Sequence, residues 1–132
     1  MSSPVIQFKA NPAIQERASL YADVTIDTAK ALKSWKKSLF SFEWMNSDGG
    51  IKSFDALSEK EQPKRQEVED AINNGKPLAK PVLGIGIMDN IEIGMGRAEF
   101  LTAALHGQKT IPVHVLRSNL PDFKSFIVEE KS

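Results

Sequence analysis

Hydrophobic and polar positions are most regular in the second half of the chain, where two apolar runs lie close together. Val82–Met88 and Ile91–Gly94 are rich in aliphatic residues, and Asp89-Asn90 separates them. Asp and Asn both tolerate the positive φ that a tight hairpin turn requires. The pattern therefore predicts an antiparallel hairpin with a two-residue turn.

A helix and a further strand are predicted directly after this hairpin. An apolar stripe at helical spacing predicts a helix from about Arg97 to His106, ended by Gly107. The stripe consists of Phe100, Leu101, Ala104 and Leu105. The run TIPVHVL, residues 110–116, predicts a strand, and Pro112 indicates a sheet edge or the start of that strand.

The first forty residues carry weaker signals. Val5–Lys9 predicts a short strand, which Asn11-Pro12 ends. Asp27 is the expected N-cap of a helix that runs to about Leu39. The outer face of this helix is basic and consists of Lys30, Lys33, Lys36 and Lys37. We expect this face either to be solvated or to contact a nucleic-acid backbone.

An aromatic stretch follows this helix. Phe40, Phe42 and Trp44 alternate with polar residues, which indicates a strand packed in the core, with stacking on a base as the alternative. Asp48-Gly49-Gly50 then marks a turn. A helix is predicted at Pro63–Ile72 with Gly75 just beyond its end, and a short helix or strand at the start of the tail, residues 122–132.

Composition bounds the class of protein. The 132 residues suit one domain, and a hydrophobic content of 41% is enough for a core. Seventeen basic and seventeen acidic residues give no net charge, which argues against a strongly basic nucleic-acid binder but not against a local basic face. No run reaches membrane length and the N-terminus lacks an apolar signal segment, so we expect a cytoplasmic protein with no membrane partner.

Metal and thiol chemistry have little support in the composition. The chain has no cysteine, which excludes disulfides and thiol catalysis. Its two histidines, His106 and His114, are too few for a convincing zinc cluster and are expected at the surface or the edge of the core. No zinc or haem is therefore expected.

The corner Gly94-Met95-Gly96-Arg97 carries the candidate chemistry. A strand that ends in glycine and opens a helix leaves N–H groups pointing outward at the positive end of the helix dipole, where phosphate binds well. Arg97 can donate two parallel hydrogen bonds to phosphate oxygens. Glu92 lies two residues before Gly94 and is expected on the same face, where a carboxylate could hold a metal ion or act as a base. Equally, glycines at such a corner can simply permit close helix packing or a β-bulge.

The order of these segments resembles the ParB/sulfiredoxin-like superfamily, also called ParB-like nuclease domains. The resemblance covers about residues 60–116. It rests on five segments: the helix Pro63–Ile72, the strand entry Lys80-Pro81-Val82, the turn Gly94–Arg97, the helix Phe100–Gly107 and the strand opening Ile111-Pro112-Val113.

The resemblance implies a small α+β domain, with a mixed sheet, a hairpin and packed helices. A single domain would then comprise a divergent N-terminal lobe (1–58), the core (59–116) and a tail (117–132). A nucleotide or nucleic-acid phosphate would bind at the corner through Gly94, Met95, Gly96 and Arg97, and through Lys64 from the preceding helix. The ligand would be ATP or CTP with Mg²⁺.

The activity implied is that of a nuclease (DNase) or NTPase acting on phosphoesters, with DNA as one class of partner. Arg97 would neutralise the phosphate, Glu92 would serve as metal ligand or base, and Lys64 would add charge stabilisation. A plasmid- or phage-encoded accessory protein, or an interbacterial effector, would suit such a domain.

The chain also departs from the family. Met95-Gly96 stands where sulfiredoxins carry a Cys-His pair, so sulfinic-acid reduction is excluded. Only about sixteen residues follow Leu116, too few for the helix-turn-helix of partition proteins. One alternative is a non-catalytic inhibitory or binding protein of the fertility-inhibition type, acting on a protein partner. Another is a structural domain with a degenerate pocket.

Overall fold

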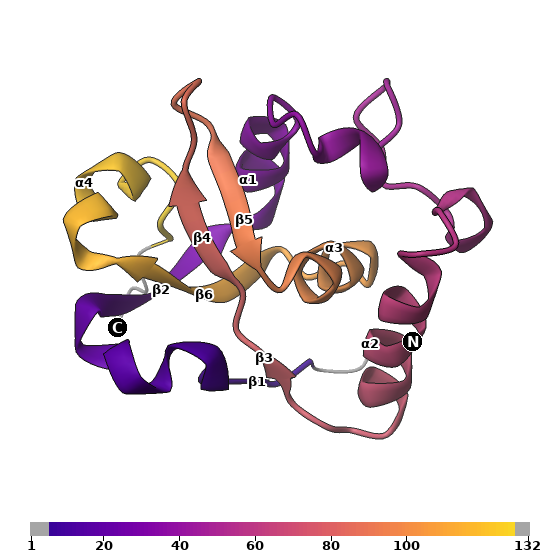
Figure 1. Cartoon of the computed structure of the whole chain (residues 1–132), viewed down its shortest axis with the longest axis horizontal. Coiled ribbons are helices and arrows are strands. Elements are labelled where there is room, and N and C mark those ends of the chain that lie inside the picture. The colour runs from indigo at the N-terminus through magenta and orange to yellow at the C-terminus, as the bar shows by residue number, and fades with distance from the viewer. Residues whose placement is uncertain (1–5, 129–132) are drawn as a thin grey trace.

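A four-stranded mixed sheet forms the centre of the molecule (Figure 1). The computed structural model describes residues 6–128. Its strands, in spatial order, are β2 (Tyr21–Asp27), β6 (Thr110–Leu116), β4 (Val82–Ile85) and β5 (Ile91–Met95). The β2–β6 and β4–β5 pairs are antiparallel, whereas β6 and β4 are parallel. The fold is therefore α+β with a mixed sheet, as predicted.

A second, smaller sheet joins two short strands in parallel. They are β1 (Phe8–Lys9) and β3 (Leu78–Ala79). The predicted strand Val5–Lys9 is thus found in its second half, while Val5 lies outside the described residues. After β1, Asn11 caps a kinked 3₁₀ helix, Pro12–Leu20, which the sequence pattern did not predict.

The α-helices lie around the sheet and supply the rest of the core. They are α1 (Thr28–Trp35), α2 (Gln62–Asn73), α3 (Arg97–Leu105) and α4 (Leu120–Phe123). In Figure 1, α1 lies beside β5, and α2 and α3 lie next to each other. The largest fully buried side chains include Trp35, Trp44, Phe100 and Phe123. Full burial of each is worth on the order of 2–3 kcal/mol, so these aromatic residues hold helices and loops against the sheet.

Helix α1 confirms the predicted cap but ends early. The carboxylate of Asp27 accepts a hydrogen bond from the backbone N–H of Lys30, which satisfies one of the free N–H groups of the first turn. The helix ends at Trp35, four residues before the predicted end at Leu39. All four lysines of the predicted basic face are exposed, but only Lys30 and Lys33 lie within the helix.

The aromatic stretch after α1 does not form the predicted strand. Residues 36–44 form a series of turns with a 3₁₀ helix at Ser41–Glu43, in which the Ser41 hydroxyl donates to the backbone carbonyls of Lys36 and Ser38. Phe40 and Phe42 are exposed, so core packing was the wrong interpretation for both, whereas Trp44 is fully buried. The predicted turn at Asp48-Gly49-Gly50 is present, with Gly49 at a φ of +93°.

The hairpin is present, but its connection is longer than predicted. Ile85 pairs with Ile91, so the loop contains the five residues 86–90 rather than two. The backbone N–H of Gly86 donates to the carbonyl of Asn90, and Asp89 adopts the left-handed conformation. Asn90 is buried and its amide donates to the Ile91 carbonyl, which keeps this residue out of the exposed part of the turn.

Strand β6 occupies the inside of the sheet rather than an edge. Pro112 nevertheless fits, because β4 flanks only His114 and Val115 of this strand. The N–H of His114 donates to the Pro81 carbonyl on the β4 side. Backbone nitrogens two residues apart in a strand point to the same side, so the nitrogen of Pro112 also faces the β4 side. The pairing with β4 does not extend to Pro112, so no hydrogen bond of the sheet is lost there. Pro112 is thus neither at a sheet edge nor the first residue of the strand, but the third residue of β6, where the β4 side is still unpaired.

The remaining elements agree with the predictions to within one or two residues. Helix α2 spans Gln62–Asn73, and Gly75 follows it at a φ of +66°. Helix α3 ends at Leu105, and Gly107 has a φ of +84°. In the tail, α4 is followed by a bridge between Ile127 and Ile26, and residues 129–132 lie outside the described part of the chain.

The N-terminal part of the chain is built into the same sheet as the rest. Every residue of β2, from Tyr21 to Asp27, pairs with β6. Residues 21–27 therefore belong structurally to the core sheet, although the resemblance to the family begins only near residue 60.

Candidate functional site

A cleft of about 560 Å³ opens at the Gly94–Arg97 corner. Its walls come from α2, β3, the end of β5 and the start of α3. Five of the six predicted site residues line it: Lys64, Gly94, Met95, Gly96 and Arg97. Other lining residues include Lys9, Glu61, Glu67, Val68, Leu78, Ile93 and Glu99. The topology thus brings the predicted corner and the predicted lysine together.

Gly96 is required at this corner for two physical reasons. It has a φ of +80°, in the left-handed region that side chains rarely adopt. A Cβ on Gly96 would also lie 2.9 Å from the Cα of Pro81, so the backbone at the entry to β4 leaves no room for it. Gly96 precedes the first residue of α3 and offers no side-chain cap, so the first turn of this helix has no side-chain acceptor at its N-cap.

Gly94 lies at a β-bulge, which redirects the end of β5. Val82 pairs with Met95 and Leu83 with Ile93, so Gly94 is the extra residue on β5. The bulge breaks the simple alternation of faces on which the placement of Glu92 depended. Glu92 does not line the cleft, and the structure does not bring it to Arg97.

Glu92 is instead held by hydrogen bonds on the side of α1. Its Oε1 accepts from the Ser38 hydroxyl at 2.6 Å, and its Oε2 accepts from the Asn90 amide at 3.1 Å. Both carboxylate oxygens are thus engaged by donors, which is an arrangement suited to joining two loops and not to coordinating a metal ion.

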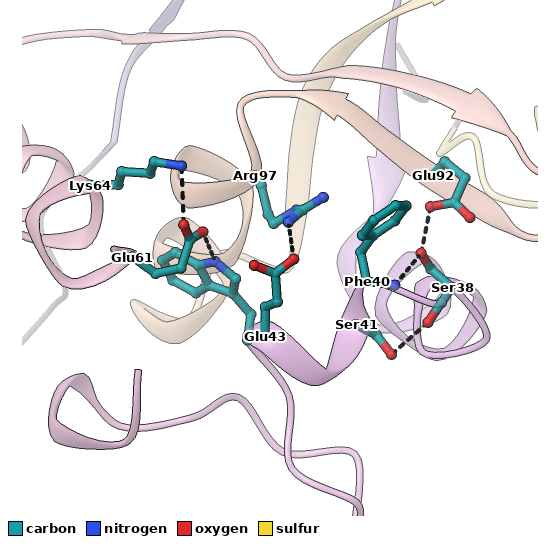
Figure 2. A network of polar contacts seen from close by, with 9 residues as sticks. Ser38, Phe40, Ser41, Glu43, Glu61, Lys64, Glu92 and Arg97 are labelled. Carbon is teal, nitrogen blue, oxygen red and sulfur yellow. Dashed lines mark hydrogen bonds and ion pairs between the residues drawn. The ribbon is translucent and has the colours of Figure 1, made fainter. Parts of the chain in front are cut away.

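Arg97 lies near two aromatic rings and a carboxylate. Figure 2 shows the carboxylate, that of Glu43, and one of the rings, that of Phe40. Nη1 of Arg97 donates to Oε1 of Glu43 at 3.0 Å, and its guanidinium carbon lies 5.5 Å from the ring centre of Phe40 and 5.7 Å from that of Trp35. The side chain is 26% exposed. Its Nε is buried and has no hydrogen-bond partner within residues 6–128, so this arginine retains donor capacity.

Lys64 belongs to a chain of polar contacts that reaches the core. Its Nζ lies 3.0 Å from Oε2 of Glu61, whose Oε1 accepts a hydrogen bond from the buried indole N–H of Trp44 at 2.8 Å. Burial by itself would raise the pKa of Glu61. The hydrogen bonds from Trp44 and Lys64, with the charges of Lys64 and Arg97, outweigh burial and lower that pKa below its ordinary value. Glu61 is therefore ionised and anchors both partners.

Two further carboxylates face the cleft. Glu99 lies in the first turn of α3, and burial raises its pKa, with a smaller contribution from the charge of Glu67; a hydrogen bond from its own backbone N–H opposes the shift. Together with Glu61 they balance the three cations of the lining, Lys9, Lys64 and Arg97. The cleft accordingly combines a cationic corner with a carboxylate region.

Neither histidine takes part in the cleft. His114 is buried, donates to Asp23 through Nδ1 at 2.6 Å and accepts the backbone N–H of Asn11 at Nε2. His106 lies at the end of α3 and contacts Glu69 of α2 at 2.6 Å. Within residues 6–128, no group of three or more His, Cys, Asp or Glu side chains is arranged to hold a metal ion.

Sequence reasoning missed the acidic half of this site. Glu43 is distant in sequence from Arg97, and nothing in its local pattern indicated the contact. Glu67 and Glu99 lie on helices whose positions were predicted, and Glu61 directly precedes α2. Whether these carboxylates face the cleft depends on how α2 packs against α3. Burial of Trp44 was the one signal available for Glu61, because a buried indole N–H requires an acceptor.

No family model, curated protein or solved structure matches this chain. The resemblance described above therefore rests on the residues and on the order of elements. In the part of the chain that the structure describes, none of the helices has the length and apolar character needed to cross a membrane.

Proposed function

We propose that this protein is a nucleotide-binding domain of the ParB/sulfiredoxin-like type, which holds a phosphate group at the Gly94–Arg97 corner. The observation that carries the proposal is the meeting of Arg97, Lys64 and the uncapped start of α3 at one cleft. Each of these favours an anion, since cationic side chains and helix N-termini both stabilise phosphate.

The mixed charge of the cleft favours a nucleotide over a simple polyanion. A nucleotide carries its negative charge at one end, while its sugar hydroxyls and base amino groups donate hydrogen bonds. Glu67 and Glu99 could accept such bonds, and Val68, Leu78 and Ile93 supply apolar surface for a base. ATP and CTP are therefore the ligands to test first. A bound Mg²⁺ would have to rely on the phosphates of the nucleotide, because the described residues do not form a metal site of their own.

The order of elements adds support for the family. Helix α2, the β4–β5 hairpin, the glycine-arginine corner, α3 and β6 follow one another as the resemblance requires. The parallel pairing of β4 with β6 places α3 on the crossover between them, with its N-terminus at the cleft.

In its catalytic form, the proposal is that the protein hydrolyses phosphoesters as an NTPase or nuclease. Glu99 replaces Glu92 as the candidate base, because Glu99 faces the cleft and has a raised pKa, which makes its carboxylate a better proton acceptor. Arg97 would stabilise the charge that develops on the phosphate.

A second candidate is the non-catalytic binding or inhibitory protein. It is favoured by the Glu43 carboxylate, which already neutralises Arg97 in this structure. It is also favoured by the placement of Glu92 away from the cleft. Such a protein would bind its ligand or partner without turning it over.

Titration calorimetry with ATP and CTP, with and without Mg²⁺, tests the proposal. Arg97→Ala is expected to lower affinity on the order of tenfold or more, since a charge-assisted contact is worth roughly 1.5–3 kcal/mol. Arg17→Ala, which removes an exposed arginine outside the cleft, is the matched control. Absence of binding by the unaltered protein would contradict the proposal. Binding without hydrolysis, in an assay of released phosphate and of DNA cleavage, would select the second candidate.

A further inference from the structure

Helix α1 and the turn after it carry a concentrated positive charge on a protein whose total charge is zero. Residues 28–42 include four lysines and no acidic residue. Lys30, Lys33, Lys36 and Lys37 are exposed, and within the described residues none of them forms an ion pair. A face of this kind attracts an anionic partner.

Large apolar side chains are exposed beside these lysines. Leu39, Phe40 and Phe42 are 81%, 53% and 67% exposed, and in the loop of the β4–β5 hairpin Ile87 and Met88 are 96% and 67% exposed. Five such side chains on two loops are more than the isolated apolar residues normal on a protein surface. We call the four lysines and these five residues the basic-apolar face.

The two loops are joined at Glu92. The Ser38 hydroxyl, at the start of the turn after α1, donates to Glu92 at 2.6 Å. At the start of the hairpin loop, Gly86 packs so closely that a Cβ there would lie 2.9 Å from the Glu92 side chain. Figure 1 shows the hairpin loop and the turn after α1 at the same end of the molecule. The two segments that carry the apolar side chains therefore lie at one end, and the turn after α1 also carries Lys36 and Lys37.

We propose that the basic-apolar face binds the surface of an anionic lipid bilayer, with the apolar side chains inserted among the headgroups and the lysines on the lipid phosphates. Three of the five apolar residues, Leu39, Ile87 and Met88, are aliphatic. They gain from transfer to acyl chains, whereas base stacking would use only the two phenylalanines.

A second copy of the chain is disfavoured as the occupant of this face, because two such faces would bring two sets of lysines together. The earlier expectation of no membrane partner rested on the lack of a spanning segment, which does not bear on surface binding.

This inference does not depend on the proposed nucleotide site. Of the exposed residues on the basic-apolar face, Phe40 contacts Arg97, so it is left unchanged in the test. The two pairs chosen are Leu39→Ser with Phe42→Ser, and Lys36→Gln with Lys37→Gln. Lys76→Gln with Lys124→Gln is the control pair, because both lysines are exposed on other segments.

The experiment measures co-sedimentation with vesicles of phosphatidylcholine alone and of phosphatidylcholine mixed with phosphatidylserine. We expect binding to the mixed vesicles only, weakening as salt is raised. Each test pair should lower the binding constant on the order of tenfold, while the control pair leaves it nearly unchanged. Melting temperatures of all variants confirm that they fold, which the exposure of the altered residues favours.

Three results would overturn the inference. The first is no binding to the mixed vesicles. The second is an equal loss for the control pair, or no loss for the apolar pair, either of which would indicate nonspecific charge attraction. The third is binding of single-stranded oligonucleotides that both test pairs weaken, without vesicle binding, which would assign the face to nucleic acid.

Discussion

The carboxylate of Glu43 lies 3.0 Å from Nη1 of Arg97, at the place where the proposed function requires a phosphate oxygen. The two side chains are 29% and 26% exposed, so the pair is only partly desolvated. It links the turn after α1 to the start of α3. A phosphate that binds Arg97 therefore competes with a carboxylate of the same molecule.

Glu43→Gln is expected to increase the affinity for ATP or CTP several-fold, because an amide competes less well than a carboxylate for the guanidinium. The free energy of unfolding should fall by no more than about 1 kcal/mol, the usual limit for a partly exposed ion pair. Calorimetric titration and thermal melting measure the two quantities. An affinity that falls would mean that Glu43 helps to position Arg97 for the ligand.

Gly96→Ala is expected to destabilise the fold by about 2–4 kcal/mol, from backbone strain together with overpacking against Pro81. Gly107→Ala provides a matched control, since Gly107 has a similar φ of +84° but its added Cβ would have no neighbouring atom of the described residues within 4 Å. The control should cost only about 1 kcal/mol. Chemical denaturation of both variants yields the difference, and equal values would show that Pro81 moves away at no cost.

Glu99→Gln is expected to stabilise the protein at pH 7 but not at acidic pH. Because burial raises the pKa of Glu99, the folded state binds its proton more tightly than the unfolded chain does. Ionisation of Glu99 therefore lowers stability above its ordinary pKa of about 4.3, and this loss disappears as the pH falls below that value. Melting temperatures of the variant and of the exposed-residue control Glu16→Gln, from pH 4 to pH 8, test the sign.

The pH dependence of stability that Glu61 causes is expected to have the opposite sign from that of Glu99. The lowered pKa of Glu61 means that its contribution to stability is present above the ordinary glutamate pKa of about 4.3 and is lost as the pH falls through the lower value of the folded state. Glu61→Gln should weaken this acid dependence while its amide oxygen still accepts from Trp44. Glu61→Ala, which leaves the buried indole N–H unpaired, should cost a further 1–3 kcal/mol or so. A variant Glu61→Gln with unchanged acid unfolding would exclude this role.

Local chemistry predicted the second half of the fold well. The run of β-branched residues, the glycine-arginine corner and Gly107 gave the hairpin, α3 and β6 to within a few residues, because each is determined by neighbours in sequence. The five-residue hairpin loop was missed, since burial of Asn90 depends on its contacts with Glu92 and Ile91. Phe40 and Phe42 were misassigned because their alternation with polar residues imitates a strand, whereas the Ser41 hydroxyl and Trp44 stabilise turns there.

The candidate site was predicted in its basic half only. The corner residues 94–97 are consecutive in the sequence, and Lys64 came with the family resemblance, so the corner did not require tertiary information. The face taken by Glu92 was inferred from alternation, which the bulge at Gly94 interrupts. The pairing of Glu43 with Arg97 spans 54 residues, and no sequence pattern encodes a contact of that separation.

The interior position of β6 has a consequence for how this chain acquires its structure during synthesis. The ribosome releases β2 first, yet its partner β6 begins more than eighty residues later, and β4 has no other link to β2 in the sheet. Until residues 110–116 emerge, β2 and the β4–β5 hairpin remain two separate pieces with open edges. Sheet formation is thus a late, long-range event, which favours slow folding and exposes β2 to mispairing. A nascent chain arrested at Leu105 should therefore be protease-sensitive in β2, and one extended beyond Leu116 should be protected.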